Sequence, residues 1–187
     1  VPDMPAYIFS YVKQSSLLKK MLIPLYVKLS NKIINISDFY VYITKYMCDC
    51  FRNKCFCVIE GFTDINQDTI KKKYNCEKKA IMYAGALFEK FGIKLLLEAF
   101  HEIEGDYELW LFGKGDMSKE IELFSLKDPR IKYWGNLPNE EILEYEKKAK
   151  LLVNPRPTIF EFTQYSFPSK LMEYMASGTP VLTTKLL

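Results

Sequence analysis

A helix with a fixed start and a fixed stop near the end of the chain constrains the fold more than any other feature. Pro168 suits the first position of a helix, where its missing amide costs nothing, and Gly178 is a natural C-terminal stop. The helix is therefore predicted to run from about Pro168 to Ser177. The following segment, 180–184, is predicted to be a short buried strand. A helix, a Gly turn and a strand in this order are typical of open parallel sheets.

The start of this helix is a predicted anion site. Phe167 would be its cap, and because Phe has no side-chain oxygen, the amides of Ser169 and Lys170 stay open to an outside anion such as a phosphate. Glu173 lies four residues after Ser169 on the same face, and helical side chains lean toward the N-terminus. Its carboxylate can therefore accept hydrogen bonds from both hydroxyls of a ribose. The spacing indicates a nucleoside diphosphate sugar.

Strands and helices alternate along most of the chain. The predicted strands cover residues 39–44, 55–59, 81–84, 108–112, 131–134 and 151–154. The predicted helices cover 45–52, a segment that begins at Gly92, 116–124 and a segment that begins at Pro138. This alternation predicts an α/β fold with a doubly wound parallel sheet, in which ligands bind at the carboxyl ends of the strands.

Two Gly turns follow predicted strands. Gly85 comes directly after one strand, where a diphosphate could pass close to a backbone without a side chain, with Lys90 as its counter-charge. By itself this pattern favours an ordinary turn and a solvated Lys90, because isolated Gly motifs are weak. Gly113 begins a second strand-to-helix turn, which lacks the third Gly of a dinucleotide fingerprint and is interpreted as a turn near the same site.

Arg156 lies between Pro155 and Pro157, which restrict the backbone and give the guanidinium a defined direction. Such an Arg suits bidentate contacts with a pyrophosphate, and the alternative is a surface Arg that caps a loop carbonyl. Tyr133 and Trp134 end a predicted strand near the expected position of a nucleobase. The alternative is that one of them is an ordinary core residue and the other lies at the rim of the core, and the sequence favours neither interpretation.

Several ordered motifs resemble the group 1 glycosyltransferases of the GT-B fold. They lie at 79–92, 111–116, 131–135, 152–155 and 165–182, and the resemblance covers roughly residues 55–187. It implies the donor-binding C-terminal domain of an enzyme that transfers a hexose or N-acetylhexosamine from a nucleoside diphosphate sugar with retention of configuration. In this context the functional interpretation of Gly85 and Lys90 is the favoured one.

The chain departs from the family's pattern at two positions. The family's first Glu falls at Tyr165, and the Arg that often follows the first-strand Gly is Ala86. Glu161 and Arg156 are the neighbours that could take over a lost contact. By itself the sequence favours a simply solvated Glu161, because exposed acids are common in loops. The resemblance thus implies Lys90, Arg156 and Glu161 as catalytic residues, and the cations would stabilise the leaving diphosphate without a metal or a cofactor. The implied donor-binding residues are Gly85, Lys90, Gly113, Tyr133, Trp134, Arg156, Tyr165, Ser169, Lys170 and Glu173.

The chain has 187 residues, which is roughly half of a complete two-domain enzyme of this fold, and we expect it to be incomplete at both ends. Residues 1–60 are predicted to be a remnant of the N-terminal acceptor domain. Residues 61–79 are the predicted interdomain connection, and 80–187 the truncated nucleotide-sugar-binding domain. Two alternative functions stay open: a non-catalytic half that needs a partner chain, and a sugar-nucleotide epimerase of the same fold.

Neither the cysteines nor the single histidine predict a metal site. Cys48 and Cys50, like Cys55 and Cys57, have one intervening residue, whereas structural zinc sites use two to four. His101 lies on a predicted helix away from the Gly turns, which argues against a three-His site and against a histidine general base.

Charge and hydropathy predict a cytoplasmic protein without a nucleic-acid partner, because the net charge is only +3 and no stretch approaches the ~20 apolar residues of a membrane span. Residues 13–32 combine Lys with apolar residues and are predicted to form a core helix with a solvated Lys face. The alternative is a peripheral contact with the anionic inner face of a membrane. The predicted partners are a nucleotide sugar and a glycan or lipid-linked acceptor, in surface polysaccharide synthesis.

Overall fold

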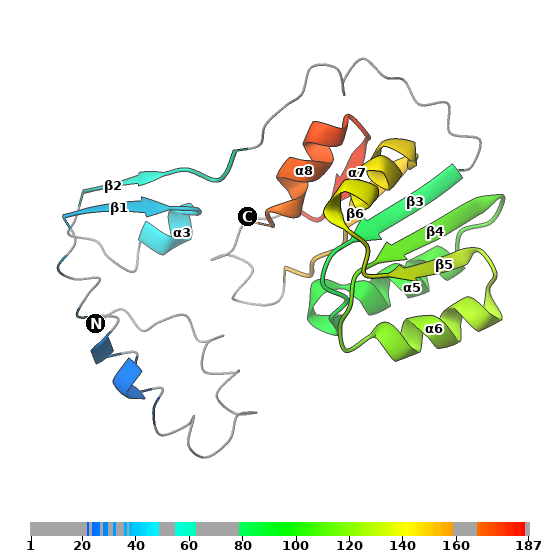
Figure 1. Ribbon diagram of the computed structural model, residues 1–187, viewed down its shortest axis with the longest axis horizontal. Coiled ribbons are helices and arrows are strands. Elements are labelled where there is room, and N and C mark those ends of the chain that lie inside the picture. The colour runs from blue at the N-terminus through cyan, green and yellow to red at the C-terminus, as the bar shows by residue number, and fades with distance from the viewer. Residues whose placement is uncertain are drawn as a thin grey trace. The chain divides into compact units, whose positions relative to one another are not determined.

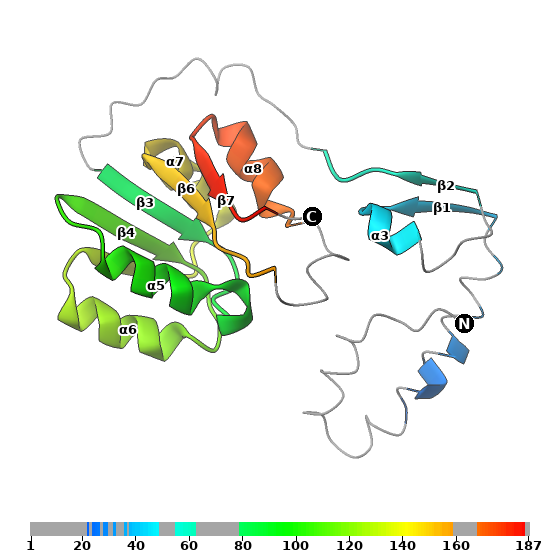
Figure 2. The ribbon, with the colours of Figure 1, turned by 180° about the vertical axis from the view of Figure 1, so that it is seen from behind.

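The computed structural model describes residues 38–48, 55–62, 79–158 and 168–185, together with single residues and short runs between 22 and 36. The chain forms two compact units (Figures 1 and 2). The first unit contains the described residues up to Phe62 and also Thr158, and the second contains 79–157 and 168–185.

In the first unit two short strands pair in parallel. β1 (Phe39–Tyr42) pairs with β2 (Cys55–Val58), and α3 (Lys45–Cys48) follows β1. The ring of Tyr42 is buried and stacks on the ring of Tyr40, with 5.7 Å between their centroids. The strand, helix and strand predicted for this part of the chain are therefore confirmed as far as its residues are described.

The second unit is a parallel sheet of five strands in the order β5-β4-β3-β6-β7. Its strands are β3 (Lys79–Ala84), β4 (Tyr107–Phe112), β5 (Ile131–Gly135), β6 (Leu151–Asn154) and β7 (Val181–Thr183). Its helices are η2 (Glu89–Phe91), α5 (Ile93–His101), α6 (Ser118–Lys127), α7 (Asn139–Lys148) and α8 (Lys170–Ser177). Helices α5 and α6 cover one face and α7 and α8 the other (Figures 1 and 2), which confirms the predicted α/β fold with a doubly wound sheet.

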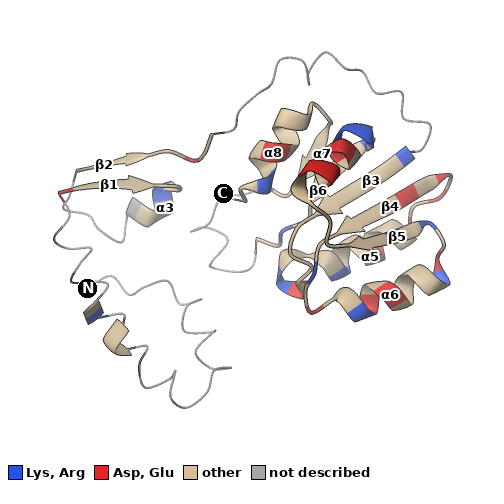
Figure 3. Cartoon of the chain, viewed as in Figure 1, with Lys and Arg blue, Asp and Glu red and all other residues tan. Residues whose placement is uncertain are grey.

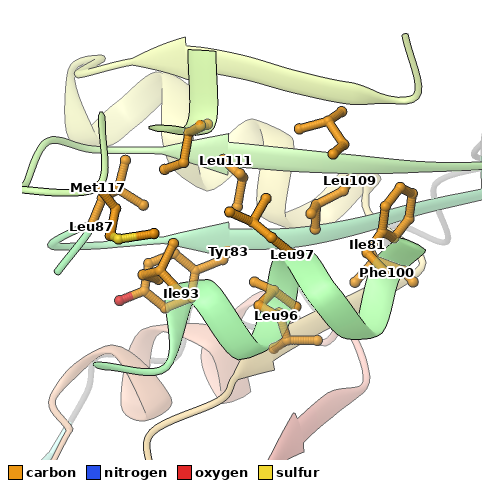
Figure 4. Packing of buried hydrophobic residues seen from close by; sticks show 13 residues of the cluster. Ile81, Tyr83, Leu87, Ile93, Leu96, Leu97, Phe100, Leu109, Leu111 and Met117 are labelled. Atoms are coloured by element: carbon orange, nitrogen blue, oxygen red, sulfur yellow. The ribbon is translucent and has the colours of Figure 1, made fainter. Parts of the chain in front are cut away.

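The central strands are buried on both faces, as their nearly continuous apolar sequences require. Helix α5 places an apolar stripe against one face, and Figure 4 shows its side chains packed among those of β3 and β4. The stripe consists of the four residues that the spacing predicts, Ile93, Leu96, Leu97 and Phe100. On the other face, Met82, Phe112 and Leu152 pack with Tyr174 of α8.

The prediction of a buried final strand is wrong. Leu182 of β7 is 61% exposed, and Thr183 is exposed as well. The reason is that β7 pairs with β6 alone and forms an edge of the sheet within the described part of the chain. An edge strand buries less of its surface than the central strands that set the apolar pattern.

Several sequence-based predictions fall largely on undescribed residues. The predicted connection 61–79 is described only at Gly61, Phe62 and Lys79. Of the segment 13–32, the described residues Leu22 and Leu25 are helical and more than half exposed. None of the helices among the described residues is long and apolar enough to cross a membrane.

Candidate functional site

The order of the strands reverses between β3 and β6. The chain runs outward from β3 through β4 to β5, and then returns to the other side of β3 as β6. Pairing of β3 with β4 continues to Ala84 and Phe112, whereas pairing with β6 stops at Met82 and Leu152. In sheets of this kind ligands bind outside the carboxyl ends of the strands at such a reversal.

A tyrosine from α8 completes the end of β3. The amide of Ala84 donates a hydrogen bond to the hydroxyl of Tyr174 (2.8 Å), and this hydroxyl donates to the carbonyl of Ala84 (3.1 Å). Tyr174 is 1% exposed, and burial raises the pKa of its hydroxyl far above the usual range. The hydroxyl therefore keeps its proton and takes the place of a strand partner beside Gly85.

The Gly85–Gly92 loop follows β3 and is fixed by the turn at Gly113–Asp116. The amide of Leu87 donates to the carbonyl of Lys114 (3.0 Å), and the amide of Glu89 donates to the carboxylate of Asp116 (3.1 Å). A side chain on Gly113 would collide with the carbonyl of Gly85. Gly113 thus lets its own backbone meet that of Gly85. The predicted approach of a diphosphate to the Gly85 backbone stays a prediction.

Two cations converge on one ring at the end of this loop. Nζ of Lys90 and Cζ of Arg156 each lie 5.2 Å from the centroid of the Phe91 ring. Arg156 is only 9% exposed, and burial lowers the pKa of its guanidinium. A side chain on Gly92 would collide with the carbonyl of Pro155, so this contact fixes the loop against the segment that carries Arg156.

The Arg156 charge also reaches Tyr83 beneath the loop. Burial raises the pKa of Tyr83 to about 12, and the positive charge of Arg156 opposes this rise. The Tyr83 hydroxyl donates to the carbonyl of Ala86 (3.1 Å), so it supports the loop directly after Gly85. The structure therefore brings together Gly85, Lys90 and Arg156 at the carboxyl end of β3.

Glu146, Lys170 and Glu173 form a second charged group, here called the carboxylate cluster. Lys170 lies one turn before Glu173 on α8, and its Nζ is 2.5 Å from Oε1 of Glu173. Glu146 of α7 is 0% exposed. Its burial and then the charge of Glu173 raise its pKa to about 8, whereas Lys170 lowers it. Figure 3 shows acidic positions on both α7 and α8, with a basic position near the start of α8.

The two predicted aromatic residues lie on opposite faces of the sheet. The Tyr133 hydroxyl donates to the carbonyl of Gly113 (3.0 Å) and lies near Ser118 Oγ (3.2 Å), so it ties β5 to the Gly113 turn. Trp134 is 45% exposed and lies parallel to the Phe112 ring, with 6.2 Å between their centroids. Phe112 and Tyr145 already pack against this indole (5.5 Å between the centroids of Tyr145 and Trp134), and its exposed part at the end of β5 is what a base can contact.

The predicted start of the last helix needs a correction. Helix α8 begins at Lys170 rather than Pro168, and its cap is Ser169, whose side chain makes no capping bond. The backbone already turns at Pro168, whose carbonyl accepts from Leu171 (2.9 Å). Proline fixes only its own φ. The sequence therefore predicts the start of the turn to within two residues, but not the residue at which the helical hydrogen bonds begin. Glu161 and Tyr165 lie outside the described residues.

Sequence reasoning missed Glu146, Phe91 and Tyr174. For Glu146 a signal exists, because it follows the buried Ile142 by four residues and therefore lies on the apolar face of α7. The surrounding Glu and Lys residues conceal this position. Among the described residues, no group of three His, Cys, Asp or Glu side chains could hold a metal ion.

The family model described as glycosyl transferases group 1 matches residues 78–186. The uncharacterized glycosyltransferase MJ1178 of Methanocaldococcus jannaschii is 26% identical over 161 residues, which cover 84% of this chain and 41% of that protein. The amylovoran biosynthesis glycosyltransferase AmsK of Erwinia amylovora is 30% identical over 112 residues, which cover 56% of this chain and 27% of that protein. The chain thus spans less than half the length of these curated relatives.

The solved structure of HepE from Anabaena in complex with UDP and glucose is similar to this chain, with a TM-score of 0.59 and 16% identity. The match covers 79% of this chain and 44% of HepE. At this level of identity the likeness shows a shared fold.

Proposed function

The chain belongs to the group 1 glycosyltransferases, and from this premise we propose that its second unit binds the nucleoside diphosphate part of a sugar donor. The observation that carries this proposal is the convergence of Lys90 and Arg156 on the Phe91 ring, at the carboxyl end of β3. Arg156 is largely buried and lies near a second cation, and Gly85 leaves the start of the loop without a side chain. This arrangement suits a pyrophosphate.

We propose that Glu173 binds the ribose and Trp134 the base, with Lys170 as a third cation toward the phosphates. Glu173 and Lys170 keep about a quarter to a third of their side-chain surface exposed, so a ligand can reach both. In the reaction, negative charge grows on the leaving diphosphate, and positioned cations stabilise it without a metal ion. Glu161 and Tyr165 remain candidates for contacts with the transferred sugar.

For the whole protein we propose transfer of a hexose or N-acetylhexosamine, with retention, to a glycan or lipid-linked acceptor in surface polysaccharide synthesis. Two relatives support this proposal: HepE was solved with UDP and glucose, and AmsK is named for amylovoran biosynthesis. The chain spans 41% of MJ1178, so sugar transfer is proposed for a protein that also includes a domain for the acceptor. A chain that binds the donor without transferring sugar would instead fit the alternative of a binding half.

Calorimetric titration with UDP and GDP in the presence of a chelator tests the donor site. Arg156→Lys removes the planar fork of donors, and one charge-assisted contact is worth about 1.5 to 3 kcal/mol, so affinity should fall about tenfold or more. Arg130→Lys is the matched control, because Arg130 also lies over a Phe ring (5.0 Å from that of Phe100) but precedes β5 and therefore lies at the amino ends of the strands, away from the proposed site.

The control should bind like the original chain. Equal losses in both variants would contradict the assignment of Arg156. Binding that needs a divalent metal ion would contradict the metal-free account.

A further inference from the structure

Glu146 is a buried acid that the donor site as described does not use. It is fully buried on α7, no N–H or O–H donor of the described residues reaches its carboxyl oxygens, and its carboxyl group lies against that of Glu173. An ionised carboxylate in such a place is strongly unfavourable, because no donor replaces the water it loses. The neutral, protonated acid is the form that this position favours.

The groups that face Glu146 within the described part of the chain come from α8. They are the Glu173 carboxylate, the Lys170 ammonium and the Tyr174 hydroxyl. The Tyr174 proton already points to the carbonyl of Ala84, so Tyr174 cannot donate to Glu146. Thr179 donates to the backbone carbonyl of Glu146 (2.7 Å) and fixes this turn of α7 beside the end of α8.

We propose that Glu146 is a positioning residue of the donor site, whose carboxyl group keeps a proton and donates it in a hydrogen bond to the Glu173 carboxylate. This inference rests on the proposed function, because it takes Glu173 to bind the ribose. Lys170 and protonated Glu146 then hold the Glu173 side chain in one orientation. The proton stays on Glu146, and no bond is made or broken.

Loss of this proton would place two carboxylates side by side. They repel each other, and both attract Lys170, so Glu173 and Lys170 move away from the orientation that suits the ligand. The pKa of Glu146, raised to about 8, places this change in the mildly alkaline range. Donor affinity should therefore fall as the pH rises through this range, and the fall should depend on Glu146.

UDP titrations of the 187-residue chain from about pH 6.5 to about pH 9 test this role. In the original chain we expect affinity to fall about tenfold, the value of one charge-assisted hydrogen bond. Glu146→Gln keeps the shape and an N–H donor but cannot ionise, so its affinity should follow only the ionisation of UDP. Glu144→Gln changes an exposed carboxylate on the same helix and should match the original chain.

Carbon-13 NMR of the Glu carboxyl groups in the ligand-free chain is a second measurement. One carboxyl should titrate near pH 8, and Glu146→Gln should remove that resonance. If no carboxyl titrates above about pH 6, the shared proton is absent and the inference is wrong, even if the variant fails to fold.

The two sets of data separate the proposals. If UDP binds and the pH profile is the same for the original chain and Glu146→Gln, the positioning role alone is overturned. If UDP and GDP bind to no form of the chain, the donor function fails and the positioning role fails with it.

Discussion

The Gly85–Gly92 loop and the carboxylate cluster are both linked to Tyr174, yet they are held in place by different physical effects. The loop depends on space, because Gly113 and Gly92 let backbone atoms touch and hydrogen bonds to the Gly113–Asp116 turn fix its path. The cluster depends on charge, because Glu146 is buried beside Glu173 with one Lys to balance them. We therefore expect the loop to be sensitive to volume and the cluster to be sensitive to proton number.

The largest expected effect is that of Gly92→Ala. Its Cβ would collide with the Pro155 carbonyl, and the φ of 84° is already unfavourable for Ala. Strain and collision together should cost about 3 kcal/mol or more, and UDP binding should be lost with the path of the loop. Urea denaturation and calorimetry would measure both.

Gly178→Ala is the matched control for this collision. Gly178 ends α8 with a similar φ of 74°, but a Cβ there would meet nothing within 4 Å. Only the conformational cost of about 1 kcal/mol should appear, with UDP affinity unchanged. Equal effects at the two glycines would mean that space does not set the loop.

This contrast shows why the fold could be predicted and the site only in part. The stripe of α5 and the Gly residues after β3 and β4 are local patterns, so they can be read from neighbouring residues. The contact between Gly92 and Pro155 joins residues far apart in the sequence, and no local pattern contains it. Glu146 had a local signal in its spacing from Ile142, but no local pattern shows that it lies against Glu173 of α8.

The next largest effect should come from Tyr174→Phe, which removes the link between α8 and the end of β3 but leaves the three residues of the carboxylate cluster unchanged. Without the hydroxyl, the buried amide of Ala84 loses its partner, at a cost of about 1 to 3 kcal/mol in the free energy of unfolding. Tyr145→Phe is the control, since its ring packs on the same face but no hydrogen bond of its hydroxyl occurs within the described residues. A similar loss in both variants would mean that the Ala84 contact does not hold the end of β3.

Glu173→Gln tests the cluster without changing its volume. If the carboxylate accepts both ribose hydroxyls, affinity for UDP should fall about tenfold, because a charge-assisted bond weakens. Affinity for a dideoxyribose analogue of UDP should change much less. Equal losses for the two ligands, accompanied by a lower melting temperature, would instead assign Glu173 to holding Lys170 and Glu146.

The smallest expected effect is that of Phe91→Leu, which removes the ring but keeps an apolar side chain in the loop. Arg156 loses a contact worth about 0.5 to 1 kcal/mol, whereas Lys90 keeps its contact with the Phe88 ring, so UDP affinity should fall about twofold to fivefold. Phe88→Leu is the control. The Phe88 ring lies near Lys90 (5.4 Å), whereas Arg156 lies over Phe91, so loss of the Phe88 ring should lower UDP affinity less. In the double variant Arg156→Lys with Phe91→Leu, the loss of binding free energy should be smaller than the sum of the losses in the two single variants, because the ring acts partly through Arg156. Fully additive losses would show that Phe91 does not orient Arg156, and the convergence of two cations on one ring would then have no part in binding.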